Sequence, residues 1–230
     1  MSKHAKVWAI VPAAGIGQRM GQERPKQYLM IQGKPILAHT LARLAQVPDF
    51  EQIIIALHPE DTYWQSLDIT DPRIQTVIGG TLRFESVLNA LKHLESQAQP
   101  SDWILVHDAV RPCITAPRVM QLLAEIKTDP VGGLWGVPVR DTLKQVDNEG
   151  RVLHTVPREI LWHALTPQIF RFELLYRALQ KAKADHIVLT DEASAIEYLG
   201  YHPKMVQGDY SNIKITWPED LAAAAYYLQD

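Results

Sequence analysis

A glycine-rich loop followed by positive side chains is the part of this sequence whose residues are best suited to chemistry. The segment from Pro12 to Gly17 follows an apolar run, and Arg19, Arg24 and Lys26 come soon after it. Glycine lets a backbone approach a ligand closely, and exposed N–H groups in such a loop cradle phosphate oxygens. Arginine and lysine add the positive charge that suits a polyphosphate. We predict that Arg19 and Lys26 contact phosphate, whereas Arg24 alone is better explained as an exposed residue.

Two familiar phosphate-binding motifs do not match this loop. The dinucleotide fingerprint requires a third glycine where this chain has Met20, and the next strand ends in His58-Pro59 instead of an acid that would bind a ribose. The P-loop requires Gly-Lys followed by serine or threonine, which is absent. The loop is therefore a candidate for phosphate binding outside both motifs.

Asp108 is the candidate metal ligand. It comes directly after the apolar run Trp103–His107, so its carboxylate is expected at the carboxyl edge of a sheet. Mg²⁺ commonly takes one or two protein carboxylates and fills its other positions with water and substrate phosphates. The competing interpretation is a turn or cap, the common role of a loop aspartate. Asp209 is a weaker second candidate, and His107 is expected to support its neighbour because no other metal-binding side chain stands at ligand spacing.

The elements that must position these residues follow from the apolar pattern. Short, uniformly apolar runs typical of strands buried on both faces alternate with stretches of helical spacing, which predicts a doubly wound α/β sheet. The predicted strands are Val7–Val11, Ile53–Leu57, Ile74–Ile78, Ile104–Val106 and Leu134–Val139, and the predicted helices between them are Ile36–Ala45, Ser86–Leu94 and Pro117–Ile126.

This alternation stops after Arg140. Two short candidate strands, Thr142–Val146 and Arg151–Thr155, flank a turn that ends in glycine, which predicts a β-hairpin projecting from the sheet. Helices are then expected at Arg171–Ala184, Asp191–Leu199 and Pro218–Leu228, with a strand at Pro203–Val206. We interpret residues 1–230 as one domain, with residues 140–158 as a hairpin arm within it.

Composition excludes several classes of protein. The 230 residues include 23 Lys or Arg and 26 Asp or Glu, a formal charge of −3, which argues against binding nucleic acid through a broad basic face. The longest apolar runs are too short to cross a membrane. Cys113 is the only cysteine, so there is no disulfide framework, and it is expected to be a small buried apolar residue. With no secretory signal at the N-terminus, the protein is predicted to be cytoplasmic.

The order of the motifs resembles one enzyme family. The loop from Pro12 to Met20, followed by Pro25-Lys26-Gln27-Tyr28, resembles nucleotidyltransferases, and specifically the 2-C-methyl-D-erythritol 4-phosphate cytidylyltransferase family of the non-mevalonate isoprenoid pathway. Further matching motifs span nearly the whole chain: Gly79-Gly80 with Arg83 and Ser86, His107–Pro112, Pro138–Thr142, His154–Arg158, Trp162–Gln168, Thr190–Ser194 and Asn212–Lys214.

The resemblance implies a fold and a reaction. The fold is a Rossmann-like, mostly parallel sheet flanked by helices, as in nucleotide-diphospho-sugar transferases, with a hairpin that reaches across the two-fold axis of a homodimer. The alternative for the hairpin is an exposed edge guarded by its charged residues. The reaction is transfer of CMP from CTP to 2-C-methyl-D-erythritol 4-phosphate with Mg²⁺, releasing pyrophosphate. Two alternatives are a cytidylyltransferase for another polyol phosphate, such as ribitol 5-phosphate, and a non-catalytic nucleotide-binding module.

The resemblance also implies a role for particular residues. Catalysis is assigned to Arg19, Lys26, Arg158 and Lys214. Nucleotide binding is assigned to Pro12, Ala13, Ala14, Gly15, Gly17, Lys26, Gly80, Arg83, Ser86 and Asp108. Binding of the methylerythritol phosphate is assigned to Ala109, Arg111, Thr142, Arg158, Thr166, Thr190 and Lys214. For Thr190 the strong alternative is the N-cap of the helix that begins near Asp191.

Overall fold

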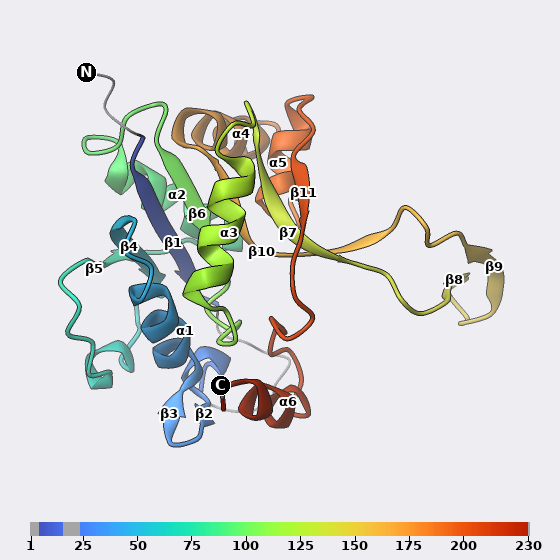
Figure 1. Ribbon diagram of the computed structural model, residues 1–230, viewed down its shortest axis with the longest axis horizontal. Helices are drawn as coiled ribbons and strands as arrows, with labels where there is room; N and C mark the ends of the chain where they lie inside the picture. Colours follow the sequence, from blue (N-terminus) through green and yellow to red (C-terminus); the bar gives the residue numbers. More distant parts are fainter. Residues whose placement is uncertain (1–4, 16–23, 230) are drawn as a thin grey trace.

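One seven-stranded sheet forms the centre of the protein, in the order β11-β7-β10-β6-β1-β4-β5 (Figure 1). The computed structural model describes residues 5–15 and 24–229 of the chain. Neighbouring strands run parallel except around β10, which is antiparallel to both β6 and β7. The strands are β1 (Val7–Ala13), β4 (Phe50–Leu57), β5 (Ile74–Ile78), β6 (Trp103–Val106), β7 (Gly132–Pro138), β10 (Trp162–Arg171) and β11 (Lys204–Gln207).

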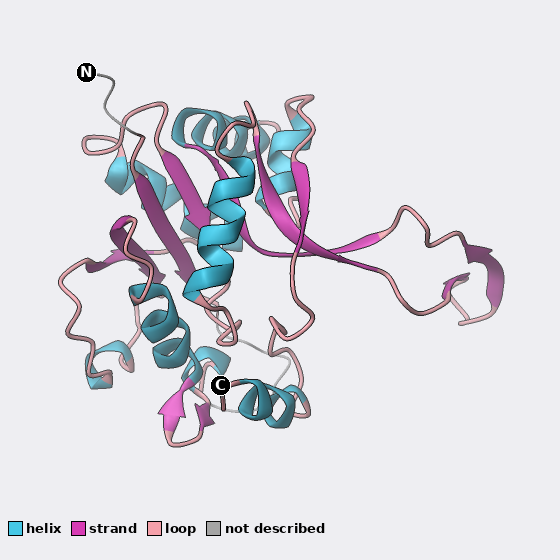
Figure 2. Ribbon diagram, viewed as in Figure 1, coloured by secondary structure: helices cyan, strands magenta, loops and turns pink. Residues whose placement is uncertain are grey.

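Helices cover both faces of this sheet (Figure 2). Because successive side chains of a strand point to opposite faces, Ala9 and Val11 of β1 join one apolar cluster while Trp8 and Ile10 join the other. The helices α1 (Ile36–Ala45) and α3 (Ala116–Ile126) pack in the first cluster, and α2 (Arg83–Leu94), α4 (Phe172–Ala184) and α5 (Glu192–Tyr198) in the second. The predicted α/β class and helix-flanked, mostly parallel sheet are confirmed.

Two strands differ from the prediction. The sequence pattern does not predict β10 as a strand, because it contains Pro167 and the polar residues Thr166 and Gln168, which are unusual in the middle of a sheet. The sheet tolerates them because the β10–β7 register shifts between Ala164 and Gln168. β5 was predicted to be buried on both faces, but it is the edge strand, and its last residue, Ile78, is 67% exposed.

A third, smaller apolar cluster includes Val110, which follows the carboxyl end of β6. It joins Leu29, Val110 and Ile215, which come shortly after Lys26, Asp108 and Lys214 in the chain. Ile215 N–H also donates to the Val110 carbonyl oxygen at 2.9 Å. The cluster includes α6 (Asp220–Tyr227) and lies near the short elements η2 (Lys26–Tyr28), β2 (Met30–Ile31) and β3 (Lys34–Pro35). Three segments that are far apart in sequence are thereby packed together.

A two-stranded hairpin projects from one side of the sheet (Figure 1). It consists of β8 (Leu143–Val146) and β9 (Val152–Val156), which pair with each other in a sheet of their own. These bounds lie within one residue of the predicted strands. The remaining short element, η3 (Trp64–Ser66), follows β4. Among the described residues, the helices are all too short or too polar to cross a membrane.

Candidate active site

A cavity of about 440 Å³ opens at the carboxyl ends of β1, β5 and β6. This edge of an open α/β sheet is where ligands bind in such folds. The cavity is lined by four segments that the sheet brings together: Pro12, Ala13, Ala14 and Gly15; Lys26 and Gln27; Gly80, Thr81, Leu82, Arg83 and Ser86; and Asp108, Ala109 and Val110, with Lys214 and Thr216 completing it.

The wall formed by Gly79 and Gly80 depends on a close approach of two backbone segments. A Cβ atom on Gly79 would lie 2.6 Å from the Ala14 Cβ and 2.9 Å from the Ser86 Oγ, distances that real side chains do not tolerate. The Ser86 hydroxyl accepts a hydrogen bond from Gly80 N–H at 3.0 Å, which ties this turn to the start of α2. The glycine pair therefore lets the turn after β5 lie against the loop after β1.

Lys26 is positioned by the two residues that follow it. The Gln27 side chain is buried and donates from Nε2 to the Ala13 carbonyl oxygen at 2.8 Å, which joins the Lys26 segment to the end of β1. The buried Tyr28 donates its hydroxyl to Asp61 at 2.7 Å, and burial together with this carboxylate raises the Tyr28 pKa above its usual value. The half-buried Lys26 thus faces the cavity from a segment that is anchored by the two residues after it.

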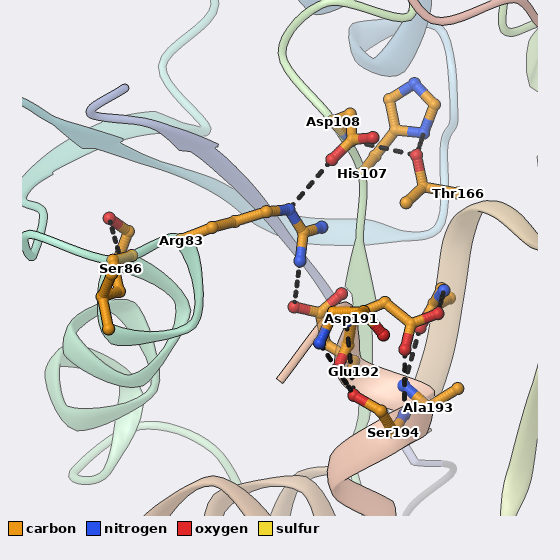
Figure 3. Close-up of polar contacts among 12 residues, drawn as sticks. Arg83, Ser86, His107, Asp108, Thr166, Asp191, Glu192, Ala193 and Ser194 are labelled. Carbon is orange, nitrogen blue, oxygen red and sulfur yellow. Dashed lines mark hydrogen bonds and ion pairs between the residues drawn. The ribbon is translucent and has the colours of Figure 1, made fainter. Parts of the chain in front are cut away.

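Asp108 is buried and surrounded by three positive side chains. Figure 3 shows one of them, Arg83, meeting the Asp108 carboxylate. Its Oδ1 accepts from Arg83 Nε at 3.0 Å, and its Oδ2 lies 3.3 Å from Arg111 Nε and 2.9 Å from Lys214 Nζ. Burial alone would raise the pKa of this carboxyl, but the attraction of Arg83, Lys214 and Arg111 outweighs burial and holds the pKa well below its usual range. Asp108 is therefore a permanent anion at neutral pH.

His107 and Thr166 hold the backbone of this anion in place. Asp108 N–H donates to Thr166 Oγ1 at 3.1 Å, and the same hydroxyl lies 3.1 Å from His107 Nδ1. Because Oγ1 accepts from the amide, its proton is available to His107 Nδ1, so His107 Nε2 carries the ring proton and donates to the Arg111 carbonyl oxygen at 3.0 Å. This order of donors requires a neutral His107, and burial lowers its pKa to about 4.

The structure brings together the predicted nucleotide-binding residues that it describes. All of them line the cavity, as do two of the residues predicted to bind the methylerythritol phosphate, Ala109 and Lys214. Two others, Arg111 and Thr166, lie behind Asp108, where they are buried and hydrogen-bonded to neighbouring protein groups. Arg19 and Gly17 fall outside the described residues.

Three predicted residues lie apart from the cavity in this chain. Thr142 and Arg158 belong to the exposed hairpin region, where Arg158 donates to the Arg140 carbonyl oxygen. Thr190 lines a separate cavity. The alternative interpretation of Thr190 as an N-cap is wrong, because the capping residue is Asp191, whose carboxylate accepts from Ser194 N–H at 2.9 Å. The substrate roles of these residues remain predictions.

Several residues that build the site were not singled out from sequence. Gln27 and Thr216 line the cavity, Glu192 pairs with Arg83 at 2.7 Å, and Asn212 links Arg111 to Thr166 through two hydrogen bonds of 2.7 Å. Gln27, Glu192 and Asn212 do lie inside the quoted motifs. Their position inside a motif is the only signal in the sequence that could have identified them. Their burial, which shows that they support the site, becomes visible only in the structure.

The donor set has one feature that suits a magnesium ion. Asp108 is the only carboxylate among the described residues that line the cavity, and an Mg²⁺ ion that also binds phosphates can use a single protein carboxylate. Within those residues no group of three or more His, Cys, Asp or Glu side chains is arranged to hold a metal. Asp209 pairs instead with Arg118 at 3.0 Å and is not a lining residue.

This fold and site define a class of protein. A glycine-containing loop after the first strand, a lysine facing it and a carboxylate held among cations are suited to binding and transferring a nucleotide phosphate, as in a nucleotidyltransferase. A family model for 2-C-methyl-D-erythritol 4-phosphate cytidylyltransferase matches residues 7–230. The chain belongs to this family.

Individual relatives of this chain support the family assignment. A protein of that name from Pseudomonas fluorescens (strain Pf0-1) is 50% identical over 216 residues, covering 93% of this chain and 92% of the relative. One from Vibrio vulnificus (strain CMCP6) is 49% identical over 221 residues, covering 96% of this chain and 93% of the relative. The crystal structure of the Francisella tularensis protein has a TM-score of 0.85 at 36% identity, covering 97% of this chain and all of that one.

The buried histidine generates a prediction about acid stability. The His107 pKa is about 4 in the folded protein against 6.5 for an ordinary histidine, so between these values the unfolded chain binds a proton that the folded protein does not. The His107 contribution is complete above pH 6.5 and is lost as the pH falls to about 4. The free energy of unfolding from urea titrations should decrease over this window by up to about 3 kcal/mol.

The control is the exposed His154 of the hairpin. His107→Gln should flatten the dependence between pH 6.5 and 4, whereas His154→Gln should leave it unchanged. An unaltered slope in His107→Gln would mean that another group is responsible.

Proposed function

We propose that this cavity carries out the family reaction, in which CMP is transferred from CTP to 2-C-methyl-D-erythritol 4-phosphate. The products are 4-diphosphocytidyl-2-C-methyl-D-erythritol and pyrophosphate. The observation that carries the proposal is that Arg83, Asp108 and Lys214 line one cavity together with the glycine loop and Lys26, in a chain that belongs to the family. A cavity lined by Lys26, Arg83 and Lys214 suits a substrate that carries a triphosphate.

The chemistry requires positioning more than proton transfer. An oxygen of the acceptor phosphate attacks the α-phosphorus of CTP in line, and the bond from that phosphorus to the bridging oxygen breaks, so pyrophosphate leaves with the electron pair. An ionised phosphate is already a nucleophile and needs no strong base. Lys26, with Arg19 from outside the described residues, stabilises the negative charge that develops on the phosphates.

The two substrates occupy different parts of the cavity. The nucleotide is framed by Pro12, Ala13, Ala14, Gly15, Gly17, Gly80, Arg83 and Ser86, where close backbone contacts favour a small cytosine ring over a purine. The acceptor lies near Ala109 and Lys214, and its phosphate is held by Lys214 and Arg158. Arg111 and Thr166 act from behind, by holding Asp108 toward both substrates.

Magnesium would be held by Asp108 together with phosphate oxygens of CTP. When bound, it supplies positive charge that neutralises the triphosphate and polarises the α-phosphorus. Both Asp108 oxygens contact Arg83, Arg111 or Lys214 in this structure. Lys214 is the most exposed of the three, so it is the cation that can turn from Asp108 to the acceptor phosphate.

A homodimer through the hairpin would complete this site. Thr142 and Arg158 lie outside the cavity of their own chain, and the region of residues 140–162 exposes Val152, Leu153 and Ile160 to 58%, 58% and 85%. Apolar side chains this exposed on a projecting element are suited to cover another subunit. We therefore place Thr142 and Arg158 in the cavity of the partner.

Pyrophosphate release tests the reaction and the role of Lys26. Release should require CTP together with 2-C-methyl-D-erythritol 4-phosphate, and Lys26→Ala should lower the turnover number by at least about 10²-fold, as expected for loss of a preorganised charge. The assay measures pyrophosphate with CTP and a panel of polyol phosphates, including ribitol 5-phosphate. The exposed Lys34 provides a matched control, and Lys34→Ala should behave like the wild-type protein.

Release with ribitol 5-phosphate alone would reassign the acceptor. CTP binding without release for any acceptor would identify a non-catalytic module. A near-normal turnover number in Lys26→Ala would refute the role given to that lysine.

Removal of divalent cations tests the metal. Excess chelator should abolish pyrophosphate release, and added Mg²⁺ should restore it, because the triphosphate charge is then neutralised again. Asp108→Asn should shift the Mg²⁺ concentration for half-maximal rate upward, measured by titration of Mg²⁺ at fixed CTP. Full activity in chelator would show that no metal is needed, and an unshifted titration in the variant would remove Asp108 as its ligand.

Mixed dimers test the sharing of sites. Lys26→Ala and Arg158→Ala chains, each inactive alone, are coexpressed with different tags and purified as heterodimers. If the arm completes the partner's site, one site combines the intact Lys26 of one chain with the intact Arg158 of the other, and about half of the wild-type activity returns. Heterodimers as inactive as the parents would show that each site is built from one chain.

A further inference from the structure

Glu192 is a fully buried carboxylate next to the active site. It is the first residue of α5, and its Oε1 accepts from Arg83 Nη1 at 2.7 Å (Figure 3). Within the described part of the chain, its Oε2 and the Arg83 Nη2 are both buried without a hydrogen-bond partner. Burying a charge this incompletely satisfied is costly, so an ion pair at this place is poorly explained by stability alone.

Arg83 connects Glu192 to the reaction centre. Its Nη1 donates to Glu192 while its Nε donates to Asp108 at 3.0 Å, so one guanidinium is held between two carboxylates. Burial acts to lower the pKa of Arg83, but the two carboxylates outweigh burial and raise that pKa above its usual value. Two fixed points restrain a planar guanidinium far more than one does, because a single hydrogen bond still allows rotation.

Glu192 is itself held rigidly by the start of its helix. Gln168 of β10 accepts from Ala193 N–H at 2.8 Å and donates to Asp191 Oδ2 at 2.8 Å, while Asp191 caps the helix through Ser194 N–H. The first turn of α5 is therefore fixed to the same strand that supplies Thr166 to Asp108. This fixed support lets Glu192 determine where the guanidinium lies.

We propose that Glu192 is a positioning residue, which holds Arg83 in the orientation that meets Asp108 and faces the phosphates of the nucleotide. This inference rests on the proposed function. Glu192 is not a lining residue of the cavity and acts only through Arg83. Arg83 also lines the neighbouring cavity, so without Glu192 the guanidinium has space to turn away from Asp108.

A role limited to charge predicts a different result. Arg83, Arg111 and Lys214 carry three positive charges against the two carboxylates of Asp108 and Glu192. Removing the Glu192 charge makes the cavity more positive, which on electrostatic grounds strengthens CTP binding. Loss of positioning instead weakens CTP binding and slows the reaction. Loss of a charge-only role would therefore lower the KM for CTP, whereas loss of a positioning role would raise it.

Two substitutions separate these roles. Glu192→Gln keeps the shape and removes the charge, whereas Glu192→Asp keeps the charge and withdraws it from Arg83 by one methylene group. We expect both to lower kcat/KM for CTP by about tenfold or more, since each weakens a charged hydrogen bond. The dissociation constant of CTP, measured by calorimetry, should rise in both. Glu197→Gln, at an exposed position of the same helix, is the control and should match wild type.

A double variant tests whether the effect passes through Arg83. If it does, Glu192→Gln should add little to the defect of Arg83→Gln, because the group being positioned is already gone. Tighter CTP binding in Glu192→Gln, wild-type kcat/KM in Glu192→Asp, or full additivity in the double variant would each overturn the proposal. Absence of pyrophosphate release in the wild-type protein would instead refute the proposed function, and so the two failures are distinguishable.

Discussion

The burial of one carboxylate organises this protein. An aspartate removed from water needs compensating charge, and Asp108 receives it from three residues on different parts of the chain. Arg83 comes after the edge strand β5, Arg111 from the loop of Asp108 itself, and Lys214 from the segment after β11. Ion pairing at a single point therefore requires both halves of the sheet to present their carboxyl ends at one place. The resulting cluster is also the positively charged wall of the cavity.

Apolar packing gives this charged cluster its precision. Coulomb attraction is weakly directional, so it does not by itself place a lysine to within a fraction of an ångström. Leu29, Val110 and Ile215 pack together close to Lys26, Asp108 and Lys214, so each functional side chain extends from a backbone fixed by close packing. Hydrogen bonds such as the one from Gln27 to the Ala13 carbonyl complete the arrangement. The charges select which segments meet, and the packing determines how they meet.

Features that depend on the local apolar pattern could be predicted from the sequence, whereas features that depend on contacts between distant segments could not. The strands β1 and β4 follow from uniformly apolar runs and the helix α1 from apolar residues at helical spacing, and both patterns reflect burial. β10 has polar residues and a proline at its centre, so its pattern resembles a loop until neighbouring strands are present. Within the site, residues of suitable chemical type were found from the motifs, whereas Glu192, Gln27 and Asn212 act through contacts between distant segments. Such contacts depend on tertiary packing, which spacing along one chain does not encode.

The apolar cluster around Ile215 has a consequence for how the protein is made. A ribosome completes the strands that carry the glycine loop and Asp108 well before Lys214 and α6 emerge. Until then Asp108 lacks one of its three cations, and Leu29 and Val110 lack the side chains that cover them. A nascent chain can therefore hold much of its sheet while its catalytic pocket is still open to water. The capacity to bind a triphosphate therefore arises only after the segment of Lys214 and α6, which follows every strand of the sheet, has been made.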